Sequence, residues 1–252
     1  MKIVKMLGVV IVLAVLGLIV PQENSYAQGG IVVPNEFADM SGDLLIPSAL
    51  TCSDNPNGIR AQSLYPAEDF VKGSIFGFAS RLTPFGSGFS TVTIPNVTIK
   101  LSTTTRTNAT LSPNFADNVG PDETIVHQGP LTIDAVPDCN SDPCPFPPLG
   151  ILQTPFDYDP ANGNLLFEIV VPPCVGGIPN FVDLDGTSDL VSVVNQDFDA
   201  PDGNVLNFGL ITKFGMSTMR PIPTVSEWGL IAMAGLLGIV GFITIRRRYS
   251  TA

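Results

Sequence analysis

The sequence predicts an all-β protein: a single antiparallel β-sandwich or jelly-roll-like domain, flanked by an N-terminal signal helix and a C-terminal transmembrane helix. Three observations lead to this prediction. Short segments of the central region alternate apolar and polar residues, and glycine-containing turn dipeptides separate them. Helical periodicity is absent from this region over any length above about ten residues. Long apolar runs occur only near the two ends of the chain.

Residues 1–27 have the pattern of a secretory signal peptide. Lys2 and Lys5 precede an apolar run of fourteen residues, LGVVIVLAVLGLIV. Ser25 and Ala27 then place small residues at the −3 and −1 positions of a signal-peptidase site. We therefore expect cleavage after Ala27. An uncleaved membrane anchor is the alternative, and in both cases the body of the chain is exported.

The body, residues 28–220, has about 190 residues, which is enough for one sizeable core. Residues 90–104 alternate apolar and polar positions on both sides of Pro95, which predicts two strand segments with a proline bulge or edge. Residues 129–136 and 205–214 also alternate apolar and polar positions, which predicts a strand in each. Residues 164–171, NLLFEIVV, form a nearly continuous apolar run, as a central strand would.

Turn dipeptides separate these segments, and their glycines are expected to supply the positive φ that tight turns require. They are Asn57-Gly58, Asn162-Gly163, Asp185-Gly186 and Asp202-Gly203. Short strands separated by such turns favour a single antiparallel β-domain.

The body is strongly acidic, with 21 acidic and seven basic residues and a net charge of −14. Nucleic acids and anionic lipids require clusters of Lys and Arg, so the composition argues against both as partners. It suits a soluble surface protein whose molecules repel one another, or one that binds cations.

The four cysteines predict disulfides, because an exported chain folds in an oxidising compartment and their number is even. Cys139 with Cys144 closes a short loop, which leaves Cys52 with Cys174; the other two pairings remain open. A zinc site is the alternative, but it favours closer paired spacing and histidine ligands.

Catalytic motifs are not found, so we expect no enzyme activity. His127, the only histidine, lies in TIVHQG and is expected on a strand surface or in a turn. A serine hydrolase triad would need it, but the chain has no Gly-x-Ser-x-Gly elbow. Acidic residues are numerous enough to provide a glycosidase pair, although they lie where turns alone would place them.

Calcium is the one cofactor for which the sequence offers candidate ligands. Alternating carboxylates in tight loops can converge on a hard cation, and a neighbouring glycine permits the turn. Two loops have this pattern, and neither matches an EF-hand; their candidate ligands are Asp183, Asp185 and Asp189, and Asp197, Asp199 and Asp202. Solvated turn carboxylates are the alternative.

Residues 221–252 form a distinct tail. Residues 228–245 contain no charge and, at about 1.5 Å per residue, form a helix of roughly 27 Å, close to the thickness of a bilayer core. The amphipathic ring of Trp228 suits the headgroup layer at one end of this span. Three basic residues, Arg246, Arg247 and Arg248, follow the span and favour the cytoplasmic side. The body then lies across the membrane from the cytoplasm.

The tail resembles the IPTL-CTERM sorting signal, a relative of the PEP-CTERM tails of Gram-negative bacteria. The motif covers residues 222–229: Ile222, Pro223 and Thr224 match, Val225 replaces Leu, and Trp228 and Gly229 match. The resemblance implies recognition by an exosortase, removal of the tail, and transfer to the cell surface or release. The expected precursor is anchored in the inner membrane.

These features together lead us to expect a structural or interaction protein of the cell surface or extracellular matrix. A carbohydrate-binding module, with exopolysaccharide as ligand, is the alternative. Its aromatic platform would rest on Tyr65, Tyr158 and phenylalanines, because the only tryptophan lies in the tail. A secreted hydrolase is the third candidate.

Overall fold

The computed structural model describes residues 28–47, 56–174, 181–185, 190–218 and Gly235. The chain divides into two compact units at Thr218, and every described strand belongs to the first. Antiparallel strands dominate this body, as the sequence predicts, and its only described helices are single turns of 3-10 helix. They are η1 (Asn35–Ala38), η2 (Ala67–Asp69), η3 (Phe115–Asn118) and η4 (Pro160–Asn162).

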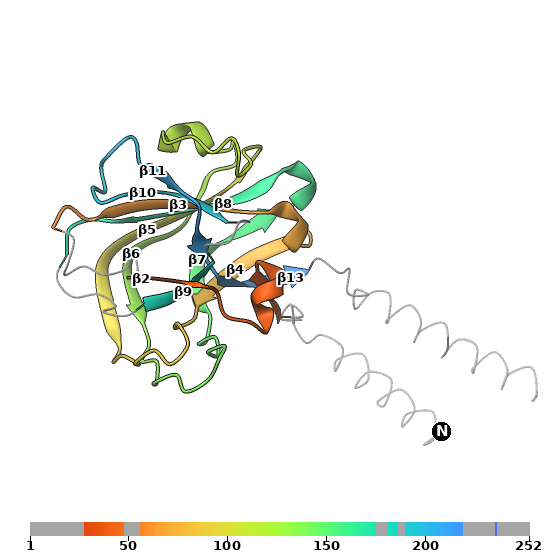
Figure 1. The fold of residues 1–252 in the computed structure, drawn as a ribbon. Coiled ribbons are helices and arrows are strands. Elements are labelled where there is room, and N and C mark those ends of the chain that lie inside the picture. The colour runs from red at the N-terminus through yellow and green to blue at the C-terminus, as the bar shows by residue number, and fades with distance from the viewer. Residues whose placement is uncertain (1–27, 48–55, 175–180, 186–189, 219–234, 236–252) are drawn as a thin grey trace, which may run out of the picture. The chain divides into compact units, whose positions relative to one another are not determined.

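Two larger sheets form the layers of the body (Figure 1). The four-stranded sheet contains, in spatial order, β1 (Gln28–Val33), β13 (Thr212–Thr218), β4 (Gly73–Ser80) and β7 (Gly150–Tyr158). The six-stranded sheet contains β11 (Asn204–Leu206), β10 (Val191–Asn195), β3 (Ile59–Tyr65), β8 (Asn164–Val171), β5 (Val92–Thr104) and β6 (Thr124–Ile133). A small third sheet contains β12 (Gly209–Leu210), β9 (Phe181–Asp185) and β2 (Leu44–Pro47).

The main core lies between the two larger sheets. Side chains from β3, β5 and β8 meet those of β4, β7 and β13, and aromatic rings fill the centre. Phe214 of β13 lies 5.1 Å from Tyr65 and 5.4 Å from Phe70, centroid to centroid. The body therefore holds a complete core of its own, consistent with a sandwich that folds as one unit.

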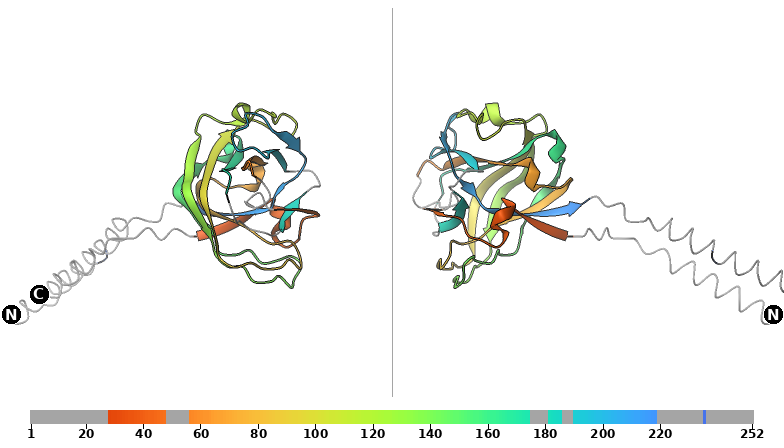
Figure 2. Two further views of the ribbon diagram at one scale, coloured as in Figure 1. Left: turned by 90° about the vertical axis from the view of Figure 1, so that its left-hand side faces the viewer. Right: turned by 45° about the vertical axis from the view of Figure 1, so that its right-hand side comes forward.

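Strand β8 occupies the centre of the six-stranded sheet, as its apolar sequence predicts. Its neighbour β5 is a single strand of 13 residues, and its pairing with β6 shifts register between Ile94 and Val97. The bulge at Pro95 is therefore confirmed. The register shifts again between Ile99 and Lys100, and β5 and β6 curve around one side of the body (Figure 2).

Two expectations about local structure were wrong. Residues 205–214 do not form one strand: they are divided among β11, β12 and β13, which belong to three different sheets. Gly58 and Gly163 have the expected positive φ of 75° and 138°, but Gly203 does not. A Cβ at Gly203 would come within 2.9 Å of Phe115 and Val193, so close packing is what requires glycine there.

Among the described residues, no helix is long and apolar enough to cross a membrane. The predicted signal helix and nearly all of the predicted transmembrane segment lie outside those residues. Gly235, the one described residue of that segment, is helical.

Candidate functional site

The two ends of the body lie next to each other. Strand β1 pairs with β13 from Gln28 opposite Ser217 to Val33 opposite Thr212. The chain therefore enters and leaves the body at the same end of the four-stranded sheet (Figure 1). Residues 1–27 and the sorting tail are thus attached at neighbouring points, and removal of either would leave every described strand of the body intact.

The sorting residues, from Ile222 to Gly229 and from Arg246 to Arg248, lie outside the described residues, as do Ser25 and Ala27 of the predicted cleavage site. Their connection to the body is nevertheless short. Three residues separate Thr218, the last residue of β13, from Ile222. An extended chain of this length reaches at most about 14 Å, so the motif begins close to the folded body.

A buried charge network lies on the face of the six-stranded sheet that points away from the main core. Its centre is Glu168 of β8, which is 2% exposed. Gln62 of β3 and Lys100 of β5 are its direct neighbours in register. The carboxylate accepts a hydrogen bond from Gln62 and forms ion pairs with Arg60 (3.2 Å) and Lys100 (3.4 Å).

The segment around η3 covers this network. The Gln62 amide donates to the Phe115 carbonyl (3.0 Å) and accepts from the Asn118 amide (3.0 Å). The guanidinium of Arg60 lies 4.5 Å from the centre of the Phe115 ring. A second small core of apolar side chains lies beside it, again under η3. The network therefore holds the covering segment onto the sheet.

Both oxygens of Glu168 are engaged by cations and an amide. Lys100 also binds Glu123 (3.2 Å) and so joins the two carboxylates. Sequence reasoning missed this site. The available signal was a single Glu inside the apolar run NLLFEIVV, because a charge in a central strand requires buried partners.

His127 is not a surface or turn residue, so that expectation was wrong. It lies in β6 opposite Ile99 of the main core, and its side chain is buried. Among the residues that the structure describes, its Nε2 atom has no hydrogen-bond partner. Along β6 it is in phase with Leu131 and Ile133, whose side chains pack against the main core, so extending the alternation of residues 129–136 toward the N-terminus would have placed His127 on the core face.

The aromatic platform expected for carbohydrate binding is not formed by Tyr65 and Tyr158, because both rings are buried. The Tyr65 hydroxyl donates to the Leu210 carbonyl (3.1 Å), and that of Tyr158 donates to the Gly163 carbonyl (2.8 Å). Burial raises the pKa of both phenols well above the usual value. These tyrosines therefore serve the core and its neighbouring turns.

The structure places the two groups of candidate calcium ligands in different kinds of segment. Asp183 and Asp185 lie on strand β9, and Asp189 lies outside the described residues. Asp197 caps its own turn by accepting a hydrogen bond from the Asp199 amide (3.1 Å). Within the described parts of the chain, no three His, Cys, Asp or Glu side chains are grouped to hold a metal ion, so Asp197, Asp199 and Asp202 do not converge.

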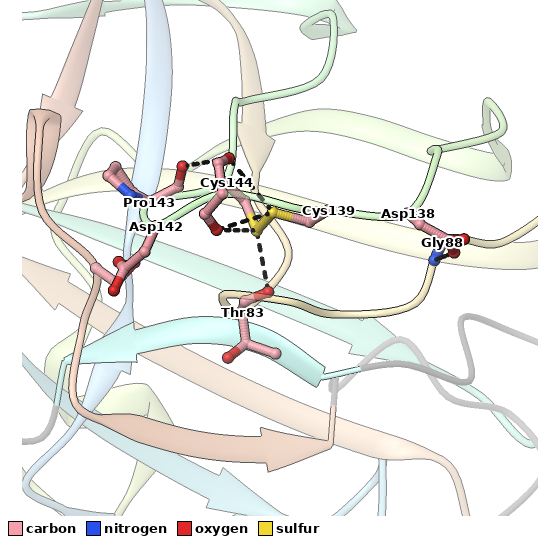
Figure 3. The surroundings of a disulfide bond; sticks show 9 residues. Thr83, Gly88, Asp138, Cys139, Asp142, Pro143 and Cys144 are labelled. Carbon is pink, nitrogen blue, oxygen red and sulfur yellow. Dashed lines mark hydrogen bonds between the residues drawn. A yellow bond between two sulfur atoms is a disulfide. The ribbon is translucent and has the colours of Figure 1, made fainter.

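The predicted disulfide between Cys139 and Cys144 is present (Figure 3). Cys174 is also disulfide-bonded, and its expected partner, Cys52, lies outside the described residues. The Cys139–Cys144 bridge packs with Leu82 in a third small core, where the Cys144 Sγ atom lies 3.0 Å from the Thr83 carbonyl oxygen. The bridge closes a local loop and packs against residues 82 and 83, which are far from it in sequence.

Comparison with known families identifies the tail. Residues 220–248 match the model of the IPTL-CTERM motif, which contains every sorting residue named from the sequence. No curated protein and no solved structure matches the chain. The chain therefore carries an exosortase-type IPTL-CTERM sorting signal, which implies export and membrane-anchored sorting to the cell surface.

Proposed function

We propose that this chain is a membrane-anchored precursor from which an exosortase-type enzyme removes the tail. The released body then acts as a structural or interaction protein of the cell surface or extracellular matrix, without catalysis of its own. The match of residues 220–248 to the IPTL-CTERM motif is the observation that carries this proposal.

The geometry of the body supports the proposal. Both signals are attached at one end of the four-stranded sheet, and β1 and β13 are complete without them. The extended backbone that a processing cleft needs is favoured by Pro221 and Pro223, because proline fixes φ and disfavours helix at the preceding residue. A cut in this region would release an intact domain.

The test is substitution within the motif in the producing cell. Pro223→Ala and Thr224→Ala leave the apolar span and the arginines unchanged, so membrane insertion should survive while processing fails. Full-length precursor should accumulate in the inner-membrane fraction, and the mature form should disappear from the surface and the medium. Cell fractionation measures the accumulation of the precursor and the loss of the mature form, and mass spectrometry identifies the termini of the mature form.

Ser226→Ala is the matched control, because Ser226 occupies one of the two variable positions between Val225 and Trp228. This variant should mature normally. Normal maturation of Pro223→Ala and Thr224→Ala as well would show that the motif is not read and that the tail is a plain membrane anchor.

A further inference from the structure

The end of the four-stranded sheet remote from the tail carries a distinct group of loops. Thr218, where the tail is attached, lies opposite Gly73 at the start of β4, whereas Thr212 lies opposite Ser80 at its end. The length of these strands separates the two ends by about 20 Å. The chain continues from Ser80 into residues 81–89, which lie against residues 136–144.

We define the disulfide pole as residues 39–41, 81–89 and 136–144. Hydrogen bonds join its three segments, among them the following four. The Cys139 amide donates to the Gly86 carbonyl (2.9 Å), and the Gly88 amide donates to Asp138 (2.7 Å; Figure 3). Ser41 donates to Asp142 (2.8 Å), and the Arg81 guanidinium donates to the Met40 carbonyl.

Phe85 belongs to the disulfide pole and has a backbone conformation that costs free energy. Its φ is 58°, and it is the only non-glycine residue in the described part of the chain with a positive φ. It follows Pro84 in a turn closed by the Gly86 amide and the Thr83 carbonyl (3.0 Å), a position that glycine normally occupies. The ring is 72% exposed, so packing inside the domain does not offset the strain.

The loop that carries Phe85 is packed and hydrogen-bonded against the other loops of the pole. The pole has its own small core of Leu82, Cys139 and Cys144, and the disulfide closes one of its loops. A rigid aromatic side chain loses little conformational entropy on binding, which is the property of an interface anchor. Met40, 52% exposed, adds a second apolar side chain to the same pole.

The charges of the pole select the kind of partner. Asp39, Asp138 and Asp142 belong to the same pole and are exposed. The only basic residue of the pole is Arg81, whose side chain is buried and stacks on Phe146 (4.8 Å). A complementary surface therefore has an apolar pocket inside a positively charged rim. A second copy of this acidic pole and an anionic bilayer would both be repelled.

We propose that the disulfide pole is the surface by which the exported body binds a protein partner, with Phe85 inserted into an apolar pocket that basic residues surround. The proposal concerns the body and does not depend on how the tail is processed.

The probe for this proposal is a random peptide library displayed on phage, selected on the immobilised body, residues 28–218, with its disulfides intact. Enriched peptides should combine positive charge with apolar residues. Their affinity should fall by about tenfold or more in Phe85→Asn and Phe85→Gly, as expected when an anchor residue is removed. It should also fall as ionic strength rises.

These two substitutions keep the test independent of folding. Asn and Gly both tolerate a positive φ, so each variant relieves the strain and should melt no lower than the wild type. Val71→Asn is the matched control: Val71 is 51% exposed and lies close to the start of β4, at the end where the tail is attached. This variant should bind the peptides as the wild type does.

Several results would overturn the proposal. If the peptides bind the Phe85 variants as tightly as they bind the wild-type body, they are attracted by its net charge alone and Phe85 is not an anchor. The absence of enriched peptides, or enrichment of acidic ones, would refute the assigned chemistry. Sedimentation showing a dimer that Phe85→Asn abolishes would make the pole a self-association surface. Flotation with anionic vesicles that requires Phe85 would make it a membrane contact.

Discussion

Replacement of Glu168 by Leu should destabilise the body strongly, because it removes the centre of the buried charge network. Glu168 is bonded to Gln62 and ion-paired with Arg60 and Lys100 at 3.2 and 3.4 Å. With an effective dielectric constant near 20, each such pair has a gross Coulomb energy of about 5 kcal/mol. The substitution leaves two cations facing an apolar side chain.

The net loss should be smaller than the gross energy. The side chains of Arg60 and Lys100 are 21% and 24% exposed, and Lys100 keeps its ion pair with Glu123. Loss of one partner of a buried ion pair typically costs about 3–5 kcal/mol, and we expect the lower end of this range for Glu168→Leu. The second substitutions Arg60→Met and Lys100→Met should then restore most of the lost stability, because no unpaired buried charge remains.

Urea unfolding of the body, followed by circular dichroism with the disulfides intact, measures this effect as a shift of the midpoint. Lys72→Met is the matched control. It breaks the exposed ion pair with Asp159 (2.7 Å) and should leave the midpoint unchanged. If Glu168→Leu shifts the midpoint no more than Lys72→Met does, the network does not stabilise the fold and our account of the covering segment is wrong.

Three further predictions concern the core and the disulfide pole. Tyr65 and Tyr158 are the only tyrosines of the body, and burial raises the pKa of both, so their hydroxyls stay protonated in the folded state. Stability should therefore be full below about pH 10, where phenols of the unfolded chain ionise, and should fall as the pH rises above it. Tyrosinate absorbance should appear only together with unfolding; its appearance in the folded body would contradict the burial of the two phenols. His127→Leu should raise the free energy of unfolding by about 1 kcal/mol, because it removes a buried ring nitrogen without a partner; a lower urea midpoint would show that the ring makes a needed contact. Replacing Cys139 and Cys144 by Ser should cost about 2 kcal/mol in the chain-entropy model for so short a loop, and an unchanged midpoint would contradict it.

Features encoded by neighbouring residues could be predicted from the sequence. The sorting tail was identified because such a signal consists of a linear motif, an apolar span and a basic cluster in fixed order. The central position of β8 followed from its apolar run, and the bulge of β5 followed from Pro95, which has no amide hydrogen for the ladder. Cys139 and Cys144 are close enough in sequence for a local loop to pair them.

Features that depend on which strands become neighbours could not be predicted. The alternation of residues 205–214 is continuous, but the partners of its parts lie in three sheets, so only tertiary structure divides it. Gly203 was wrongly interpreted because the approach of Phe115, from a distant segment, decides its surroundings. His127 is the exception, because it lies in phase with the core-facing Leu131 and Ile133 and the alternation of β6 could have placed it.

The two sites of most interest have the same origin. The network around Glu168 takes its members from β3, β5 and β8, and the disulfide pole unites three segments separated by about forty residues or more. The alternation of apolar residues along a strand specifies which side chains are buried, but not which distant strand lies beside them. The sequence by itself therefore determined the fold class and the sorting signal of this protein. The partners of the buried charges and the loops that lie beside Phe85 were decided only when distant segments were packed together.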